Sequence, residues 1–295
     1  FKSSFPSDQG IVSVLSQSGG NIGQMVNLPA LRGVRFGKVV SYGNAADLNE
    51  CDFMEYMGED PETKIISAYI EGVREGKRFF NALRKTAWHK PVIILKGGRT
   101  SAGTKAVASH TASMSGEQSV WNAMCRQTGT LSVSSMEEMA DLMVAFTFLN
   151  PVKGTNVGLG GGGGGMSVQA ADACEEAGLK VIPFPLDLQQ QLKERDPVYW
   201  EWIGNPIDVS ILGASPLNFS DIMVMVADNP AFDVLICSLD EQWTLSEPRD
   251  LPRAKETIES FLSISKRTSS TNSVNGKRAT TVPSLQIEFP TPFSS

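Results

Sequence analysis

The side chains best suited to covalent chemistry are the two histidines, His89 and His110. A neutral imidazole is abundant near pH 7, and its nitrogen can attack phosphorus to form a labile phosphoramidate. His110 stands in a run of small and hydroxyl residues over 103–116, which predicts a mobile or ligand-facing loop. His110 is therefore a candidate nucleophile, and the alternative is a loop histidine with ordinary hydrogen bonds. His89 is expected to be a helix C-terminal cation or a solvated loop residue.

Two glycine-rich turns could bind a phosphate group. The first offers backbone N–H groups and hydroxyls at a helix start, where the helix dipole favours anions, and its candidate contacts are Ser16, Ser18, Gly19 and Gly20. The second is a run of six glycines, whose candidate contacts are Gly163, Gly164 and Gly165. The plainer interpretations are a steric turn and a flexible loop. Neither turn fits a P-loop or a dinucleotide fingerprint, so this chain alone is not expected to bind a nucleotide.

The elements that must position these residues alternate between strands and helices. Apolar, β-branched runs predict strands, and amphipathic runs between or after them predict helices. The strands are expected at 11–15, 38–42, 64–70 and 91–95, and the helices near 50–58, 75–88, 117–126 and 135–148. Such alternation is typical of a parallel sheet with helices on both faces. The first domain is accordingly assigned to residues 1–150.

A second set of elements follows Asn150-Pro151. It comprises strands at 156–159 and 233–237 and helices at about 166–177 and 252–264. The fold class is therefore α/β, with two doubly wound parallel-sheet domains. The second domain, 151–264, is expected to be incomplete, because residues 268–282 do not supply the buried strand that should follow its last helix.

The end of the chain has a different composition. Residues 265–295 are rich in Ser, Thr, Asn and Pro, which cannot bury enough apolar surface to offset the entropy of ordering. We expect a disordered or aberrant tail, with a frameshifted or truncated end as a hypothesis. The first residue is Phe1, and the sequence is expected to be a piece of a longer chain or a separately cut subunit.

Composition excludes several classes of function. The net charge of −6 and the pI of about 5.1 argue against binding to nucleic acid or to an anionic membrane. Residues 1–30 lack a leader pattern and no apolar run is long enough to span a bilayer, so a cytoplasmic protein is expected. The four cysteines are scattered, so we predict plain buried thiols and no metal site.

The His110 segment resembles a known family. Residues 109–116, S-H-T-A-S-M-S-G, look like the S-H-T-G-S-x-x-G loop of the NDP-forming acyl-CoA synthetases, which include ADP-forming acetyl-CoA synthetase and are related to succinyl-CoA synthetase. Ala112 replaces the glycine of that pattern, and alanine resists positive φ. The resemblance covers most of residues 10–130 and extends through L-S-Q-S-G-G at 15–20, S-Y-G-N-A-A-D at 41–47, D-P-E-T-K at 60–64, Y-I-E-G at 69–72 and K-P-V-I-I-L-K-G-G-R at 90–99.

The resemblance implies roles for these residues. His110 corresponds to the histidine that is transiently phosphorylated, and Glu71 to the glutamate that contacts it. A carboxylate that accepts one imidazole N–H fixes the tautomer and raises nucleophilicity at the other nitrogen, although a surface carboxylate is the plainer interpretation of Glu71. Two helices that follow the glycine-rich turns of two flavodoxin-like, succinyl-CoA synthetase-like domains are implied to point at the phosphohistidine. A-A-D-A at 170–173 and N-P-I-D at 205–208 match the second domain.

The implied reaction interconverts acyl-CoA, ADP and phosphate with a carboxylic acid, CoA and ATP. The resemblance implies that CoA and ATP or ADP with Mg²⁺ are substrates, bound mainly by an upstream CoA-binding domain and an ATP-grasp domain or subunit outside this chain. It also implies a small carboxylic acid substrate and an oligomer. The alternatives are a regulatory, acyl-CoA-sensing module associated with a protein acetyltransferase and, last, a structural subunit.

Overall fold

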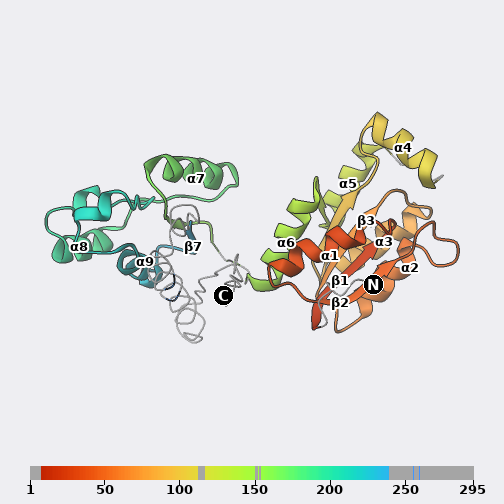
Figure 1. The fold of residues 1–295 in the computed structure, drawn as a ribbon, viewed down its shortest axis with the longest axis horizontal. Helices are drawn as coiled ribbons and strands as arrows, with labels where there is room; N and C mark the ends of the chain where they lie inside the picture. The colour runs from red at the N-terminus through yellow and green to blue at the C-terminus, as the bar shows by residue number, and fades with distance from the viewer. Residues whose placement is uncertain are drawn as a thin grey trace, which may run out of the picture. The chain divides into compact units, whose positions relative to one another are not determined.

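The computed structural model describes residues 8–111, 117–149, 152, 154–238, 255 and 259, without the side chains of 106 and 108–111. The described residues up to Leu149 form one compact unit, and those after it belong to a second (Figure 1). No helix within these ranges is long and apolar enough to cross a membrane.

The first unit is built on a five-stranded parallel sheet. Its strands are β1 (Gln9–Ser16), β2 (Phe36–Ser41), β3 (Ile65–Ile70), β4 (Val92–Lys96) and β5 (Leu131–Val133). Their order across the sheet is β2-β1-β3-β4-β5, and every pairing is parallel. This is the flavodoxin-like order, so the α/β fold class expected for this unit is confirmed.

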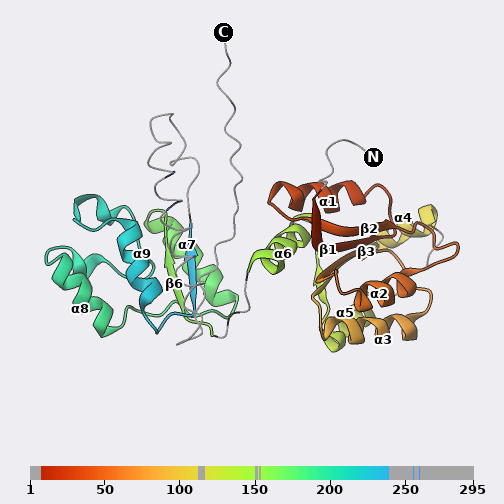
Figure 2. The same ribbon diagram turned by 90° about the horizontal axis from the view of Figure 1, so that it is seen from below.

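Helices cover both faces of this sheet (Figure 2). One face packs against α1 (Ile22–Leu31) and α6 (Met136–Phe148), and the other against α2 (Glu50–Glu59), α3 (Gly76–Ala87) and α5 (Gln118–Thr128). Neighbouring residues of one strand therefore enter different cores: Val14 packs in the α1 and α6 layer and Leu15 in the opposite layer. Burial on both faces explains why the central strands β3 and β4 are nearly continuous apolar runs.

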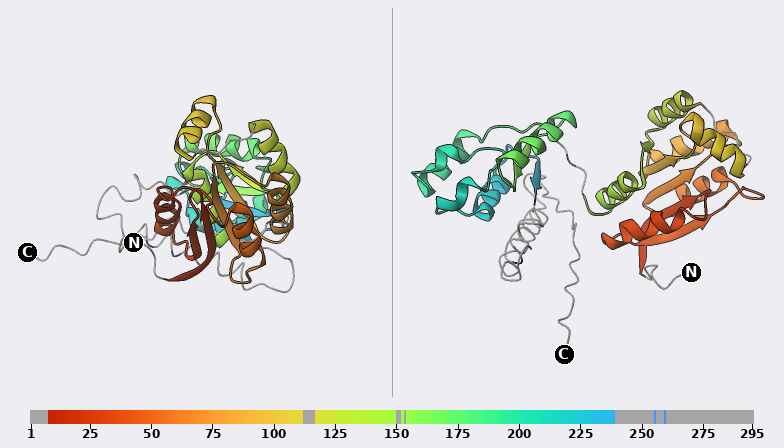
Figure 3. Two further views of the ribbon diagram at one scale, coloured as in Figure 1. Left: turned by 90° about the vertical axis from the view of Figure 1, so that its right-hand side faces the viewer. Right: turned by 45° about the horizontal axis from the view of Figure 1, so that its top comes forward.

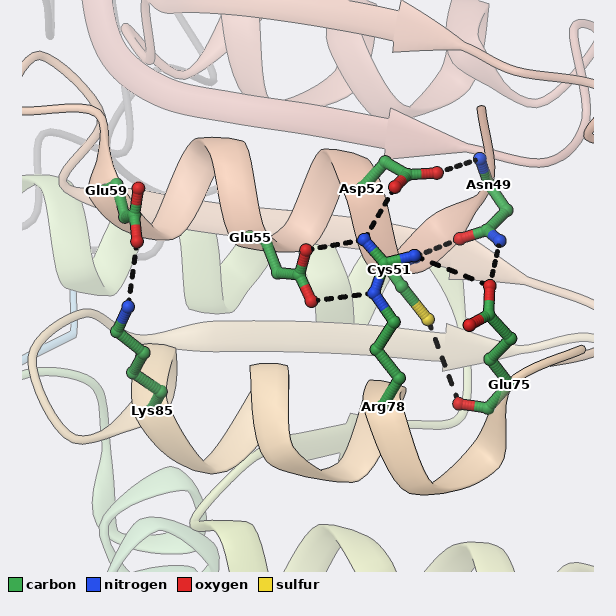
Figure 4. A network of polar contacts seen from close by, with 8 residues as sticks. All are labelled: Asn49, Cys51, Asp52, Glu55, Glu59, Glu75, Arg78 and Lys85. Carbon is green, nitrogen blue, oxygen red and sulfur yellow. Dashed lines mark hydrogen bonds and ion pairs between the residues drawn. The ribbon is translucent and has the colours of Figure 1, made fainter. Parts of the chain in front are cut away.

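Charged side chains on the outer surface join α2 to α3 (Figure 4). Asn49 caps α2 and forms a capping box with Asp52. The Arg78 guanidinium of α3 donates to Asp52 and Glu55 on α2, each at 2.6 Å, and to Glu75 at its own helix start. These bonds join the two helices next to their packed faces.

The His110 segment differs from the expected loop. Residues 103–111 belong to helix α4 (Ser101–Thr111), while residues 112–116 lie outside the described part of the chain. Thr100 starts the helix by accepting the N–H of Gly103 at 3.1 Å. Alanine and lysine are strong helix formers, and this cap and composition outweigh the hydroxyl residues that suggested a loop.

The second unit contains a parallel pair of strands, β6 (Val157–Gly160) and β7 (Val234–Cys237) (Figure 3). Its helices are α7 (Gly164–Glu176), α8 (Leu186–Arg195) and α9 (Phe219–Asp228), with 3-10 turns at Trp200–Trp202 and Ile211–Ala214. Single bridges join Asn156 to Lys180 and Gly160 to Ile207. The predicted helix at 252–264 is described only at residues 255 and 259, and the predicted tail at 265–295 lies outside the described residues.

Candidate functional site

The first unit has one topological switch point, between β1 and β3. The chain leaves β1 towards β2 on one side and reaches β3 on the other, so the connections diverge there. Ligands of open α/β sheets bind beyond the carboxyl ends of the strands at such a point. Ser16 ends β1, and Glu71 directly follows β3. The structure therefore brings two of the predicted site segments to the position where this fold binds ligands.

The turn after β1 exposes its backbone. Gly19 and Gly20 are exposed, and Ser18 is half-buried. Helix α1 then begins without a side-chain cap and without an acidic residue in its first turn. In contrast, α2 and α9 each begin with a capping box. The first-turn N–H groups of α1 are thus left for another acceptor, as a phosphate site requires.

Ser16 has a different position from the other turn residues. Its side chain is fully buried, and its hydroxyl donates to the Ser18 carbonyl at 2.7 Å and accepts the Ser18 N–H at 3.1 Å. These two bonds use the hydroxyl within the turn. The structure therefore gives Ser16 the task of shaping the turn, whereas Ser18, Gly19 and Gly20 remain accessible.

Glu71 is a buried carboxylate with an open acceptor. The residue is 6% exposed, so the surface-carboxylate interpretation does not hold. Oε1 accepts the Tyr69 hydroxyl at 3.2 Å, whereas Oε2 is buried with no hydrogen-bond partner among the described residues. Buried polar atoms nearly always have a partner, so this oxygen indicates a group yet to be supplied.

The Tyr69 hydroxyl connects Glu71 to the start of α1. It donates to Glu71, and the side chain of Asn21, the N-cap residue of α1, lies near enough to the same hydroxyl to act on its pKa. Burial, with the charge of Glu71, raises the pKa of Tyr69, so the phenol stays protonated near pH 7. The carboxylate and the helix start therefore share one polar link.

Gly97, the residue after β4, lies close to the Tyr69 and Glu71 side chains. A Cβ at Gly97 would lie 2.7 Å from the Tyr69 hydroxyl and 3.0 Å from Glu71 Cγ. Any larger side chain would displace one of the two. This close approach is the reason for the first glycine of the K-G-G-R segment.

His110 belongs to the helix that follows the next strand. Helix α4 begins five residues after Lys96, the last residue of β4, and Thr104 in its first turn donates to the Gly98 carbonyl at 3.0 Å. The backbone of His110 lies in the last turn of α4, and its side chain is outside the described atoms. The structure therefore shows where the helix of His110 begins. The contact between the His110 side chain and Glu71 stays a prediction.

The glycine run of the second unit serves several purposes. Gly161 and Gly162 have φ of +99° and +83°, which favours glycine. A Cβ at Gly161 would meet the Ser238 carbonyl oxygen at 2.0 Å, whereas Gly163 and Gly165 have open space. Helix α7 begins at Gly164, earlier than predicted, with no side-chain cap. The glycines 163–165 therefore form an uncapped helix start.

Two side chains lie beside this start. A Cβ on Gly164 would lie 2.9 Å from Oδ2 of Asp208, the aspartate of the N-P-I-D segment. The Ser167 hydroxyl, in the first turn of α7, is buried without a partner within the described ranges. Asp208 already places negative charge where the helix dipole favours an anion, so a phosphate here must share the position with it.

Two residues of this site were missed in the sequence. Gln17 lies inside the S-Q-S-G-G turn and Lys96 inside K-G-G-R, yet both side chains are buried, at 7% and 3% exposure, and both contact the backbone of Glu71. For Lys96 the available signal was a lysine directly after the apolar run at 92–95, whereas Gln17 follows Ser16 and carried no comparable signal.

Comparison with known proteins identifies the relatives of this chain. Residues 9–146 match the family model described as succinyl-CoA ligase like flavodoxin domain. The chain is 35% identical over 252 residues to acetate–CoA ligase [ADP-forming] I of Archaeoglobus fulgidus, covering 85% of this chain and 36% of that protein. It is 34% identical to the alpha subunit of the ADP-forming acetate–CoA ligase II of Pyrococcus furiosus, covering 77% and 49%.

A solved structure is also similar. It is the dinucleotide-forming acetyl-coenzyme A synthetase 1 of Candidatus Korarchaeum cryptofilum in complex with phosphate and ADP. The TM-score is 0.68 and the sequence identity 28%, and the match covers 85% of this chain and 56% of that one. The chain therefore spans between about a third and just over half of the length of these three proteins.

Proposed function

This chain belongs to the NDP-forming acyl-CoA synthetase family through its succinyl-CoA ligase like flavodoxin domain, and from that premise we propose that it carries the phosphohistidine centre of such an enzyme. The observation that carries the proposal is the buried Glu71 carboxylate, whose Oε2 lacks a partner among the described residues at the switch point of the sheet. A histidine N–H is the partner that this oxygen would take.

In the proposed reaction, an acyl-CoA and phosphate first give an acyl phosphate and free CoA. A nitrogen of His110 then attacks the phosphorus, the bond to the acyl oxygen breaks, and the carboxylic acid leaves as its carboxylate. Glu71 accepts the N–H of the other ring nitrogen and holds the reactive tautomer. Transfer of the phosphoryl group to ADP gives ATP and restores the neutral imidazole.

The glycine-rich helix starts would stabilise the phosphoryl group. The side chain of Ser18 and the exposed backbone of Gly19 and Gly20 lie at the uncapped start of α1, and the preorganised N–H dipoles of a helix start stabilise charge that develops during transfer. Gly163, Gly164 and Gly165 would act in the same way from a second flavodoxin-like domain. The solved relative that contains phosphate supports a phosphate site in this fold.

The remaining parts of the enzyme would lie outside this chain. Its relatives are longer, and one is named as an alpha subunit. We place a CoA-binding domain and an ATP-grasp domain or subunit, with Mg²⁺ bound to the nucleotide, in that remainder. A small carboxylic acid substrate, an oligomeric assembly and a cytoplasmic location complete the proposal.

The test is transfer of label from ATP. The chain is mixed with its nucleotide-binding partner and Mg-ATP that carries radioactive phosphorus in the γ-phosphate, and the bound label is tested for acid lability and base stability. We expect label on the wild type and on His89→Ala, because His89 is the only other histidine, and none on His110→Ala. Label that persists in His110→Ala would refute the phosphocarrier role, and an unlabelled wild type would favour the regulatory alternative.

A further inference from the structure

Glu71 is bound through its backbone as well as its side chain. Its N–H donates to Oε1 of Gln17 at 2.7 Å, and its carbonyl accepts Nζ of Lys96 at 2.6 Å. Gln17 follows β1 and Lys96 ends β4, and these two strands flank β3 in the sheet. Two buried side chains from opposite sides therefore fix the one peptide segment that carries the candidate carboxylate.

The Gln17 contact continues the β1–β3 ladder. The Gln17 N–H donates to the Tyr69 carbonyl at 3.0 Å, and Oε1 then accepts the N–H groups of Glu71 and Gly72 at 2.7 and 3.1 Å. A side-chain amide thereby replaces the next strand residue where the backbone of β1 turns away towards Gly19. The chain can thus leave the sheet at the switch point while Glu71 stays in strand-like register.

The Lys96 contact closes the other side. Its ammonium donates to the carbonyls of Glu71 and Gly97 and lies 5.6 Å from the centre of the Trp121 ring. Burial lowers the pKa of Lys96, and the Glu71 carboxylate opposes that effect. A buried cation is costly unless its N–H groups are used. Here the ammonium donates to two carbonyls and lies over an aromatic face.

We propose that Gln17 and Lys96 are positioning residues that hold the Glu71 carboxylate towards its histidine partner. The inference deepens the proposed function and rests on it. Both side chains contact the backbone of Glu71 and leave Oε2 open, so they set its location without occupying its acceptor. A small displacement of an orienting group can cost about a hundredfold in rate, so the loss of either contact should be measurable. We call Gln17 and Lys96 the clamp residues.

The experiment is a double-mutant cycle with Glu71. The rate of labelling from γ-labelled Mg-ATP is measured in single turnover for Gln17→Met, Lys96→Met and Glu71→Gln, and for each of the first two combined with Glu71→Gln. We expect each clamp variant alone to label about tenfold more slowly or worse. In the Glu71→Gln background we expect a further change of less than about twofold, because residues that act as a unit are not additive.

Lys90 supplies the matched control. Its Nζ also donates to two backbone carbonyls, those of Met57 and Asp60, at 2.9 and 2.6 Å. Lys90 lies just before the first residue of β4, at the end of the strand away from Glu71. Lys90→Met should label within about twofold of the wild type in both backgrounds. The inference would be overturned if Gln17→Met and Lys96→Met labelled at the wild-type rate. It would also be overturned if each substitution slowed labelling by the same factor in the Glu71→Gln background as in the wild-type background.

A second readout separates the inference from the proposed function. Hydrogen exchange of the full chain reports the protection of the Glu71 and Gly72 N–H groups, both of which donate to Oε1 of Gln17. Gln17→Met should raise exchange in a peptide over 70–73 by about tenfold or more and leave the β3 core unchanged. An unlabelled wild type refutes the phosphocarrier role, whereas unchanged exchange refutes the clamp. If Lys96→Met does not fold, Gln17→Met supplies both readouts.

Discussion

The Tyr69 hydroxyl donates to Oε1 of Glu71 at 3.2 Å, and this is the one side-chain bond of that carboxylate among the described residues. Tyr69→Phe removes the donor and leaves the ring. A hydrogen bond to a charged group contributes about 1.5–3 kcal/mol, so we expect labelling of the chain from ATP to slow by about tenfold or more. Single-turnover labelling measures this.

Tyr56 provides the control for that change. It is an exposed tyrosine on α2, at 56% exposure. Tyr56→Phe should label like the wild type. Equal rates for Tyr69→Phe and Tyr56→Phe would show that the Tyr69 hydroxyl does not hold the carboxylate.

The glycine run of the second unit should tolerate substitution unevenly. Gly161→Ala forces a Cβ to within 2.0 Å of the Ser238 carbonyl oxygen at a φ of +99°, so we expect a loss of stability of about 1–3 kcal/mol or more. Gly165→Ala enters open space in helix α7 and should leave stability unchanged or raise it. Thermal unfolding of the two variants measures the difference, and an equal melting temperature would contradict the packing described here.

The ion pairs between α2 and α3 should contribute unequally to the stability of the first unit. Arg78 joins three carboxylates and is partly buried, whereas the Lys85–Glu59 pair is exposed on both sides at 73% and 71%. Exposed pairs contribute little because solvent and salt screen them. Arg78→Met should therefore lower the melting temperature more than Lys85→Met. The difference should shrink in high salt, and a difference of the opposite sign would refute this ranking.

Asp60 should make the first unit sensitive to acid. The hydrogen bonds from Lys38 and Thr63 hold the pKa of Asp60 well below its usual range. The stabilisation is complete above the unfolded pKa of about 3.9 and is lost as the pH falls towards the lower folded value. Urea unfolding between pH 7 and pH 3 should show a shallower loss of stability for Asp60→Asn than for the wild type.

Glu62 is the matched control for Asp60. It contacts the same lysine, Lys38, at 2.9 Å, but is 60% exposed. Glu62→Gln should keep the acid sensitivity of the wild type. An identical loss of acid sensitivity in both variants would show that Lys38, rather than the partly buried Asp60 carboxylate, governs it.

The central strands of the first unit could be predicted because they are buried on both faces. The run at 64–70 corresponds to β3 at 65–70, and the run at 91–95 to β4 at 92–96. Strand β5, at 131–133, was missed because three residues, Leu-Ser-Val, carry no periodic signal. Residues 103–111 were expected in a loop, since glycine and hydroxyl residues obscured the Thr100 cap.

The sequence allowed candidate site residues to be named one by one, but it did not reveal the contacts between them. The family resemblance singled out Glu71, and the structure shows that this residue is buried, whereas the plainer interpretation was a surface carboxylate. Nothing local in the sequence relates Gln17 to a residue 54 positions later, because the contact arises only when β1 and β3 pair. The roles of His110, Glu71 and the two glycine turns stay predictions that the labelling experiments test.

The strand order also bears on how the chain folds during synthesis. β1 lies inside the sheet, and Val12 pairs with Ile65 of β3, which the ribosome produces roughly fifty residues later. At about 5–20 residues per second, β1 waits several seconds with an apolar edge unpaired. Among the strands of this sheet, β1 is therefore exposed longest to wrong partners, and nascent chains that stop before β3 should be the ones that chaperones retain.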